Sequence, residues 1–481
     1  MADNPMLKFV IRAQSYPDKR AVSERAQDFS EISQTFKVDG AEDQAARCSQ
    51  CGVPYCSVHC PLHNHIPDWL KLTAEGRLRE AYELSNATST MPEICGRICP
   101  QDRLCEGNCV IEFSGHGAVT IGSVEKFITD TAWKEGWVEP VLVGPETGYS
   151  VGIIGAGPGG LTTAEYLRAA GHDVHVYDRH DRAGGLLTYG IPGFKLEKEV
   201  VMRRVKRLED AGIHFHLGFE VGRDASLPEL REKHDAILIA TGVYKARDIK
   251  APGVGTAGVV AALDYLTASN KAGFGDHVPA HEDGSLLATG KDVVVIGGGD
   301  TAMDCVRTAI RQGAKSVKCL YRRDRENMPG SQREVQNAEE EGVEFVWLSA
   351  PLAFEGTEHV SGVKMTRMRL GQPDASGRRA PEPEPGSETS IPAGLVIKAL
   401  GYDPEELPGM FGEPGLALTR WGTLRVDPKS MMTSLDGVFA AGDIVRGASL
   451  VVWAIRDGRD VTEHMQSYLL AKAAKKERVA A

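Results

Sequence analysis

The most regular pattern in the chain is a short apolar run that ends in a glycine turn and is followed by an amphipathic helix. We expect a buried strand over residues 149–154, a helix over 161–170 and a second apolar strand over 173–177. A strand, a glycine turn, a helix and a strand in this order are typical of a Rossmann-like unit. Three glycines with the spacing G-x-G-x-x-G form the turn: Gly155, Gly157 and Gly160.

This first glycine turn has the features that a dinucleotide needs. The first glycine permits the tight turn, the second lets a pyrophosphate approach the backbone, and the third lets the helix pack on the strand. Free N–H groups at the helix N-terminus favour phosphates, and Asp178 can accept hydrogen bonds from a ribose. Gly184 and Gly185 predict another close approach to the ligand, or an ordinary loop. We interpret the unit as a dinucleotide site, with a ligand-free turn as the alternative.

The same pattern starts again at Lys291 and ends with a strand over residues 316–321. Gly297 and Gly299 take the first two glycine positions, and Ala302 takes the third. A second Rossmann-like unit is therefore predicted here.

The end of this second unit carries two arginines, Arg322 and Arg323, where the first unit has an acid. A ribose 2′-OH favours a carboxylate at this point, whereas a 2′-phosphate favours guanidinium groups. The second site is therefore predicted to prefer NADP(H) over NAD(H). A solvated basic turn is the alternative.

The order of these patterns predicts that one Rossmann-like unit is inserted into the other. A linker rich in Pro and Gly over residues 139–148 precedes the first unit; a surface loop over 372–390 and a strand over 423–426 are expected further on. We predict an α/β fold of two nested Rossmann-like domains, preceded by a mainly α-helical iron–sulfur domain. The expected domains are residues 1–146, residues 147–253 together with 403–481, and residues 254–402.

The last apolar run of the chain ends in the pair Gly442 and Asp443. An acid at such a strand end can bind a sugar-like hydroxyl; a helix-capping turn is the alternative. The final helix is expected to begin at Ser449 as its N-cap. Its N-terminus can stabilise negative charge on a reduced ring.

Eight of the ten cysteines fall into two groups of four, separated by a helical spacer that includes an expected helix over residues 78–86. A further helix is expected over residues 121–134. Thiolates suit iron–sulfur clusters and zinc. We favour two [4Fe–4S] clusters because each group contains a Cys-Pro pair, as in bacterial two-cluster ferredoxins. Structural zinc, which usually shows paired C-x2-C units, and disulfides, which are rare in the cytoplasm, are the alternatives.

The last cysteine of a run in those ferredoxins ligates the other cluster. By this rule, the expected ligand sets are Cys48, Cys51, Cys56 and Cys109 for one cluster, and Cys60, Cys95, Cys99 and Cys105 for the other. The histidines beside the first group, His59, His63 and His65, are expected to be supporting or surface groups. Cys305 and Cys319 are expected to be buried core thiols.

Composition narrows the function further. The net charge of −11 gives no electrostatic support to nucleic-acid binding. No apolar run approaches the roughly 18 residues of a membrane span. The N-terminus lacks the layout of a signal peptide, so we expect a cytoplasmic protein without a membrane partner.

Taken together, the motifs resemble those of the small (β) subunits of NADPH-dependent glutamate synthases over nearly the full length of the chain. The same architecture occurs in the N-terminal half of dihydropyrimidine dehydrogenase. The paired cysteine runs carry most of the resemblance, because the glycine motifs are common to many flavoproteins. The motifs are Cys48–Cys56, Cys95–Pro100, Gly155–Gly160, Gly185–Pro192, Gly297–Ala302 and Ala440–Asp443.

The resemblance implies FAD at the first site and NADPH at the second. It also implies that Asp443 contacts the ribityl chain of FAD and that the last helix points at the flavin ring. No side chain is nominated as a catalytic proton donor or acceptor, because hydride transfer between cofactors depends on positioning. The expected cofactor-binding residues are Gly155, Gly157, Gly160, Asp178, Gly185, Leu186, Gly297, Gly299, Asp300, Thr301, Arg322, Arg323, Gly442, Asp443 and Val451.

The resemblance further implies an electron-input subunit. A hydride passes from NADPH to FAD, and single electrons pass through the [4Fe–4S] clusters to the FMN of a large (α) amidotransferase subunit. That subunit makes L-glutamate from L-glutamine and 2-oxoglutarate. An electron-transfer subunit of the NADPH:ferredoxin or dihydropyrimidine dehydrogenase type is the alternative. The intact set of eight cysteines favours the glutamate synthase branch, because dihydropyrimidine dehydrogenase uses a non-Cys ligand in one cluster.

Overall fold

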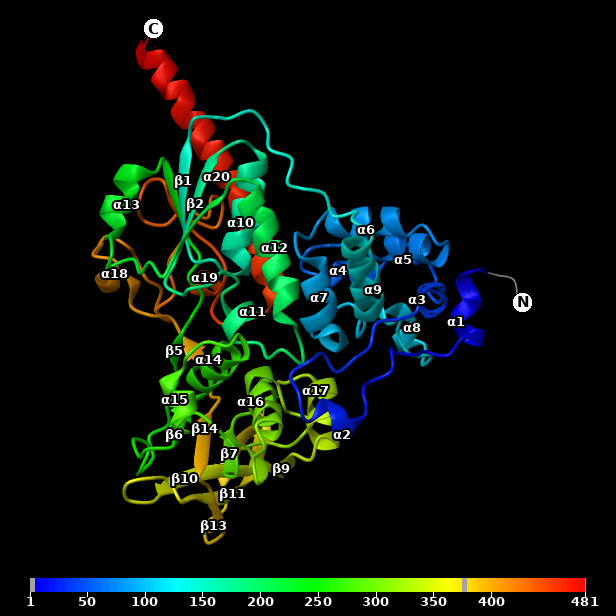
Figure 1. Cartoon of the computed structure of the whole chain (residues 1–481), viewed down its shortest axis with the longest axis vertical. Coiled ribbons are helices and arrows are strands. Elements are labelled where there is room, and N and C mark those ends of the chain that lie inside the picture. The colour runs from blue at the N-terminus through cyan, green and yellow to red at the C-terminus, as the bar shows by residue number, and fades with distance from the viewer. Residues whose placement is uncertain (1–4, 374–378, 481) are drawn as a thin grey trace.

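A computed structural model describes residues 5–373 and 379–480 of the chain. A helical N-terminal part lies beside two α/β parts that follow one another along the long axis of the molecule (Figure 1). We refer to these as the helical part, the first α/β part and the second α/β part. Among the described residues, no helix is long and apolar enough to cross a membrane.

The helical part consists of short helices around a small apolar core. Trp69, Leu70 and Phe127 are buried in this core, and the expected helices over residues 78–86 and 121–134 are confirmed. The elements are η1 (Pro5–Leu7), α1 (Lys8–Ile11), α2 (Val22–Arg25), α3 (Val38–Ala45), α4 (Tyr55–Val58), α5 (Ile66–Ala74), α6 (Leu78–Asn86), α7 (Pro92–Ile98), η2 (Gln101–Arg103), α8 (Val110–Phe113) and α9 (Ile121–Lys134).

The first α/β part is a parallel five-stranded sheet in the order β16-β4-β1-β2-β3. Its central strands are almost continuously apolar because helices and loops cover both faces. The elements before the second α/β part are β1 (Ser150–Ile154), α10 (Pro158–Ala169), β2 (Asp173–Asp178), α11 (Leu186–Tyr189), α12 (Lys198–Asp210), β3 (His214–Leu217), α13 (Leu227–Lys233), β4 (Ala236–Ile239) and β5 (Lys245–Ala246).

The second α/β part has a parallel sheet in the order β6-β14-β7-β8-β9 and an antiparallel sheet built on β11. Its elements are β6 (Val259–Ala261), α14 (Ala262–Gly273), α15 (Pro279–Glu282), β7 (Asp292–Ile296), α16 (Asp300–Arg311), β8 (Ser316–Tyr321), α17 (Gln332–Glu340), β9 (Glu344–Trp347), β10 (Ser349–Glu355), β11 (Gly362–Pro373), β12 (Arg379–Pro383), β13 (Thr389–Pro392) and β14 (Leu395–Lys398).

The expected surface loop over residues 372–390 is correct only at residues 384–388, which form a turn; the other described residues of this segment lie in strands. Strand β12 and the start of β13 lie in this segment, and both pair with β11. Residues 374–378 of the expected loop lie outside the described residues. The segment is rich in Pro and charge, but a long neighbouring strand supplies the hydrogen bonds that hold it extended.

Two short strands join the α/β parts. The chain leaves the first part through β5 and returns through β15 (Tyr402–Asp403), and these strands pair antiparallel. The returning segment adds α18 (Leu407–Met410), β16 (Val438–Ala440), α19 (Asp443–Arg446) and α20 (Val451–Ala480). The expected strand over residues 423–426 is wrong, because only an isolated bridge joins Leu418 and Leu424 there.

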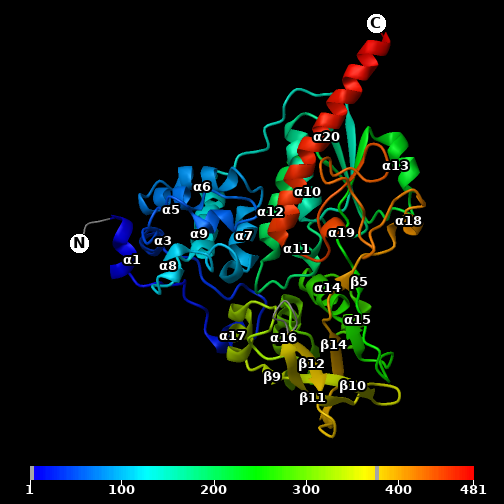
Figure 2. The same cartoon turned by 180° about the vertical axis from the view of Figure 1, so that it is seen from behind.

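Helix α20 lies along α10 in the first α/β part (Figure 2). The helices come close because glycines face each other: a Cβ at Gly458 would lie 2.5 Å from the carbonyl oxygen of Gly159. The Thr163 hydroxyl donates to the carbonyl oxygen of Gly458 at 2.9 Å. The expected N-cap at Ser449 is displaced, because the helix begins at Val451. This packing aims the N-terminus of α20 at the first glycine turn.

Candidate functional site

The three glycines of the first glycine turn differ in the space around them. Gly155 has φ +110°, and a Cβ there would lie 2.4 Å from the carbonyl oxygen of Ala240. A Cβ at Gly160 would lie 2.0 Å from the carbonyl oxygen of Gly155. Beside Gly157, in contrast, a Cβ would meet no atom within 4 Å. The outer glycines are thus required by the turn itself, whereas Gly157 leaves room that a pyrophosphate fits.

Asp178 lies at the end of β2, where it fixes the turn. Its Oδ2 accepts a hydrogen bond from the backbone N–H of Ala156 at 2.7 Å, and its Oδ1 accepts one from the N–H of His180 at 2.8 Å. Each carboxylate oxygen has two acceptor sites. Asp178 can therefore hold the turn and still accept a hydrogen bond from a ribose.

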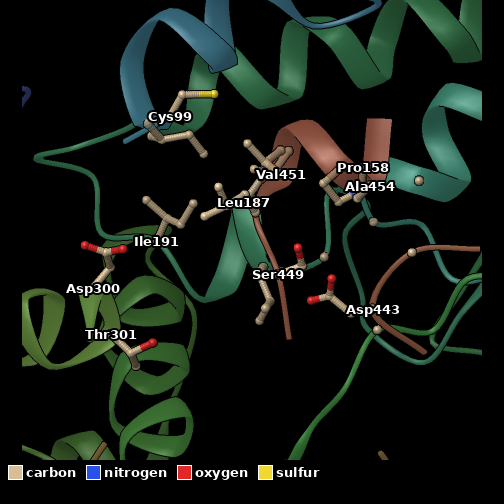
Figure 3. A pocket seen from close by; sticks show the side chains of 18 of the residues that line it. Cys99, Pro158, Leu187, Ile191, Asp300, Thr301, Asp443, Ser449, Val451 and Ala454 are labelled. Atoms are coloured by element: carbon tan, nitrogen blue, oxygen red, sulfur yellow. The ribbon is translucent and has the colours of Figure 1, made fainter. Parts of the chain in front are cut away.

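A cavity of about 290 Å³ opens from this turn and is lined by all three parts of the chain. Figure 3 shows Cys99 of the helical part at the upper left, Asp300 and Thr301 of the second α/β part at the lower left, and Val451 and Asp443 to the right of them. Gly155, Gly157, Asp178, Gly185, Leu186 and Gly442 also line it. Among the predicted cofactor-binding residues, those of the first site other than Gly160 thus line the same cavity as Asp300 and Thr301 of the second site.

Asp443 sits in the wall of this cavity. It follows Gly442, whose φ of +77° directs the chain into the short helix α19. Burial raises the pKa of Asp443 to about 6, although a backbone hydrogen bond from Ser449 favours the charged form. A half-buried carboxylate beside the N-terminus of α20 can accept hydrogen bonds from ligand hydroxyls.

Thr241 is a cavity residue that the sequence motifs did not nominate. Its hydroxyl is buried and has no hydrogen-bond partner within the described residues. Buried hydroxyls are normally hydrogen-bonded, so this atom fits a bound polar ligand. Its position in the Ala-Thr-Gly run that follows β4 was the available signal.

In the second glycine turn, as in the first, one glycine is closely packed and another faces open space. A Cβ at Gly297 would lie 2.2 Å from the carbonyl oxygen of Ala399, whereas one at Gly299 would meet no atom within 4 Å. Ala302 is fully buried at the third position. Asp300 begins α16, and its Oδ1 accepts the N–H of Ser331 at 2.9 Å. The open backbone beside Gly299 fits a second pyrophosphate.

Arg322 and Arg323 lie directly after β8, at the carboxyl end of the second parallel sheet. Arg322 is exposed and Arg323 is half-buried. Within the described residues, neither guanidinium has an ion-pair partner, and the Arg323 Nε is buried without a hydrogen-bond partner. Nearby Arg325, in contrast, pairs with Glu339 at 2.7 Å. The two unpaired guanidinium groups fit a 2′-phosphate.

The eight clustered cysteines surround two separate cavities in the helical part. Cys48, Cys51, Cys56 and Cys109 line one, and Cys60, Cys95, Cys99 and Cys105 line the other. The cavities divide the cysteines in the way that the ferredoxin rule predicts. All ten cysteines of the chain are free thiols, which contradicts the disulfide alternative.

The surroundings of both cavities disfavour free thiolates. Burial raises the pKa of Cys56 and Cys60 to about 11, so a metal cation is needed to hold these groups as thiolates. None of the three nearby histidines lines either cavity within the described residues. Glu125, which sequence reasoning missed, lines the second cavity, and burial raises its pKa to about 8.

The structure also places the remaining cysteines. Cys305 and Cys319 are fully buried in the apolar core of the second α/β part, as predicted.

Two family models match the chain. Residues 25–137 match the family described as dihydropyrimidine dehydrogenase domain II, 4Fe-4S cluster, and residues 149–458 match the pyridine nucleotide-disulphide oxidoreductases. The first match contradicts the zinc alternative, because it makes the helical part a 4Fe–4S cluster domain.

Full-length relatives agree with these matches. The glutamate synthase [NADPH] small chain of Azospirillum brasilense is 69% identical over 473 residues, which is 98% of each chain. The protein of the same name from Escherichia coli (strain K12) is 48% identical over 94% of this chain and 96% of the relative. Mycobacterium tuberculosis FprA in complex with NADPH superposes with a TM-score of 0.57 at 22% identity. That match covers 68% of this chain and 86% of FprA, and it shows the fold alone.

The fold, the sites and the two family matches define a flavin-type oxidoreductase. Along its chain, a 4Fe–4S cluster domain precedes an FAD/NAD(P)-binding region. At the level of the whole chain, it belongs to the family of glutamate synthase NADPH small chains.

Proposed function

We propose that the chain oxidises NADPH and delivers electrons to a large glutamate synthase subunit that carries FMN and makes L-glutamate from L-glutamine and 2-oxoglutarate. The main supporting observation is the cavity lined by Cys99 of the helical part, by the first glycine turn and by the start of α16, which follows the second glycine turn. Such convergence is required if electrons enter at the second α/β part and leave through the helical part.

FAD belongs at the first glycine turn in this proposal. Gly157 and the N-terminus of α10 receive its pyrophosphate, and Asp178 accepts hydrogen bonds from its ribose. Asp443 accepts hydrogen bonds from its ribityl hydroxyls, and Val451 begins the helix whose N-terminal N–H groups face the ring. When bound, FAD supplies the conversion of a two-electron hydride input into single-electron output.

NADPH belongs at the second glycine turn. Gly299 and the N-terminus of α16 receive its pyrophosphate, and Arg322 with Arg323 bind its 2′-phosphate. These residues orient the nicotinamide toward the shared cavity. No side chain needs to move a proton for this step, so positioning is the contribution of the protein.

Two [4Fe–4S] clusters belong in the two cysteine cavities, each held by four thiolates. Cys99 lines both its cysteine cavity and the shared cofactor cavity. The set containing Cys99 is therefore the first electron acceptor, and the set containing Cys48 is the second. We also propose domain limits of residues 1–146, 147–253 with 403–481, and 254–402. The inserted unit then begins after β5 and ends at the first residue of β15.

Purification from the native host tests the partner. The tagged, full-length holoprotein should co-purify with a large subunit that contains FMN, and the complex should oxidise NADPH only when glutamine and 2-oxoglutarate are both present. Iron and acid-labile sulfide should each approach about eight per chain. Recovery of a pyrimidine-reducing subunit or a ferredoxin instead would move the chain to the alternative branch.

A further inference from the structure

A group of histidines lies on the sheet of the first α/β part, away from the cofactor cavity. Strands β2 and β3 pair so that His175 lies opposite His214 and Tyr177 lies opposite His216. Alternate residues of a strand point to the same face, so Asp173 shares the face of His175. Asp173 begins β2, whereas Asp178 of the nucleotide site ends it.

Three ligand atoms converge within this group. The Nε2 atom of His175 lies 3.1 Å from Asp173 Oδ2, and the Nε2 atom of His214 lies 3.4 Å from Asp173 Oδ1. One ligand atom from each residue lies within 4.8 Å of the others. Ligands bound tetrahedrally at about 2.0–2.1 Å are separated by roughly 3.3–3.4 Å. The two distances above are close to this separation, but they reach different oxygens of Asp173, so the exposed His214 ring must rotate to bring its Nε2 onto the same ion.

Neighbouring groups hold the first of these rings in place. The Nδ1 atom of His175 lies 3.0 Å from the Nε2 atom of His216, and the rings of His175 and His214 stack with centroids 4.7 Å apart. Metal-binding histidines usually use their second nitrogen for such a hydrogen bond. His234 is engaged elsewhere, by Ser150 and Tyr177.

We propose that Asp173, His175 and His214 bind a divalent transition-metal ion, with Zn²⁺ favoured. Two imidazoles and one carboxylate suit Zn²⁺ better than Mg²⁺ or Ca²⁺, which prefer all-oxygen sites. The side chains are 49%, 23% and 57% exposed respectively, so an ion from solution reaches them directly. The ion ties the edge strand β3 to β2 and does not touch the nucleotide site.

Zinc content of the holoprotein tests this site. Tag-free holoprotein, equilibrated with Zn²⁺ and dialysed, should retain an additional zinc ion per chain by mass spectrometry, with its iron content unchanged. Asp173→Asn and His214→Gln should abolish this retention. His277→Gln is the matched control, because His277 pairs with Glu282 at 2.6 Å but belongs to no group of three possible metal ligands within the described residues, and it should retain the zinc.

Thermal unfolding supplies a second readout that does not depend on activity. Zn²⁺ should raise the melting temperature of the wild-type holoprotein, and this rise should vanish in His214→Gln, whose melting temperature without zinc matches the wild type. His216→Phe removes only the orienting hydrogen bond and should weaken zinc binding roughly tenfold. Equal zinc retention by the wild type and both triad variants, or none by the wild type, would overturn the proposal.

Discussion

At the residue scale, the free guanidinium groups of Arg322 and Arg323 should determine the choice of pyridine nucleotide. A hydrogen bond to a charged group contributes about 1.5–3 kcal/mol, so replacing either arginine with Ala should raise the KM for NADPH at least tenfold and leave the KM for NADH unchanged. Steady-state kinetics with both nucleotides measure this. Arg325→Ala is the control, because Arg325 already pairs with Glu339. Equal losses for NADPH and NADH would remove the 2′-phosphate assignment.

Asp443 should make FAD binding depend on pH. Its pKa of about 6 means that the carboxylate is charged above pH 6 and neutral below it. A charged acceptor binds ribityl hydroxyls more strongly than a neutral one, so FAD affinity should fall by up to about tenfold between pH 7.5 and pH 5.

The dissociation constant of FAD can be measured at each pH by titrating the FAD-free protein with FAD and following the flavin fluorescence. Asp443→Asn should bind FAD more weakly at pH 7.5, with an affinity that no longer changes between pH 7.5 and pH 5. An unchanged pH profile in Asp443→Asn would show that another group titrates in this window.

At the scale of single elements, substitutions at the second and third glycines of the first glycine turn should have different effects. Gly160→Ala places a methyl group 2.0 Å from the Gly155 carbonyl oxygen, which should cost about 1–3 kcal/mol of stability. Gly157→Ala enters open space and should lower only FAD affinity. Melting temperatures measured with and without saturating FAD separate these effects. Excess FAD should restore Gly157→Ala to the wild-type value but not Gly160→Ala.

The elements that could be predicted from the sequence are those with a strong local pattern. The strand over residues 316–321 and the helix over 121–134 depend on apolar periodicity and were predicted with their observed bounds. Strand β12 could not be predicted, because its extended shape depends on pairing with β11 and its own residues are proline-rich and charged. The segment over residues 423–426 shows the reverse case: it has apolar residues but only an isolated bridge to a neighbouring segment.

At the scale of the whole molecule, buried ion pairs that no sequence pattern indicates connect the parts. Lys195 of the first α/β part donates to Asp304 of α16 at 2.9 Å, and both side chains are largely buried. Lys195→Met should cost about 3–5 kcal/mol of stability, because it leaves a buried carboxylate without its partner. Thermal unfolding measures this loss. The double variant Lys195→Met/Asp304→Leu should recover much of it; failure to recover would show that Lys195 acts through other contacts.

The arrangement of the cysteine cavities around the shared cofactor cavity leads to a prediction about electron order. The glycine motifs and the cysteine spacing predicted the ligand sets, but only the folded chain places Cys99 beside Val451 in the cofactor cavity (Figure 3). In Cys99→Ala, NADPH should still bleach the flavin absorbance. The cluster held by the Cys48 set should still be reduced by dithionite, but NADPH should no longer produce its electron paramagnetic resonance signal. In Cys51→Ala, the cluster held by the other set should still be reduced by NADPH. If the cluster held by the Cys48 set is reduced at the wild-type rate in Cys99→Ala, the proposed electron order is wrong. Electrons would then reach that cluster without passing the one held by the Cys99 set.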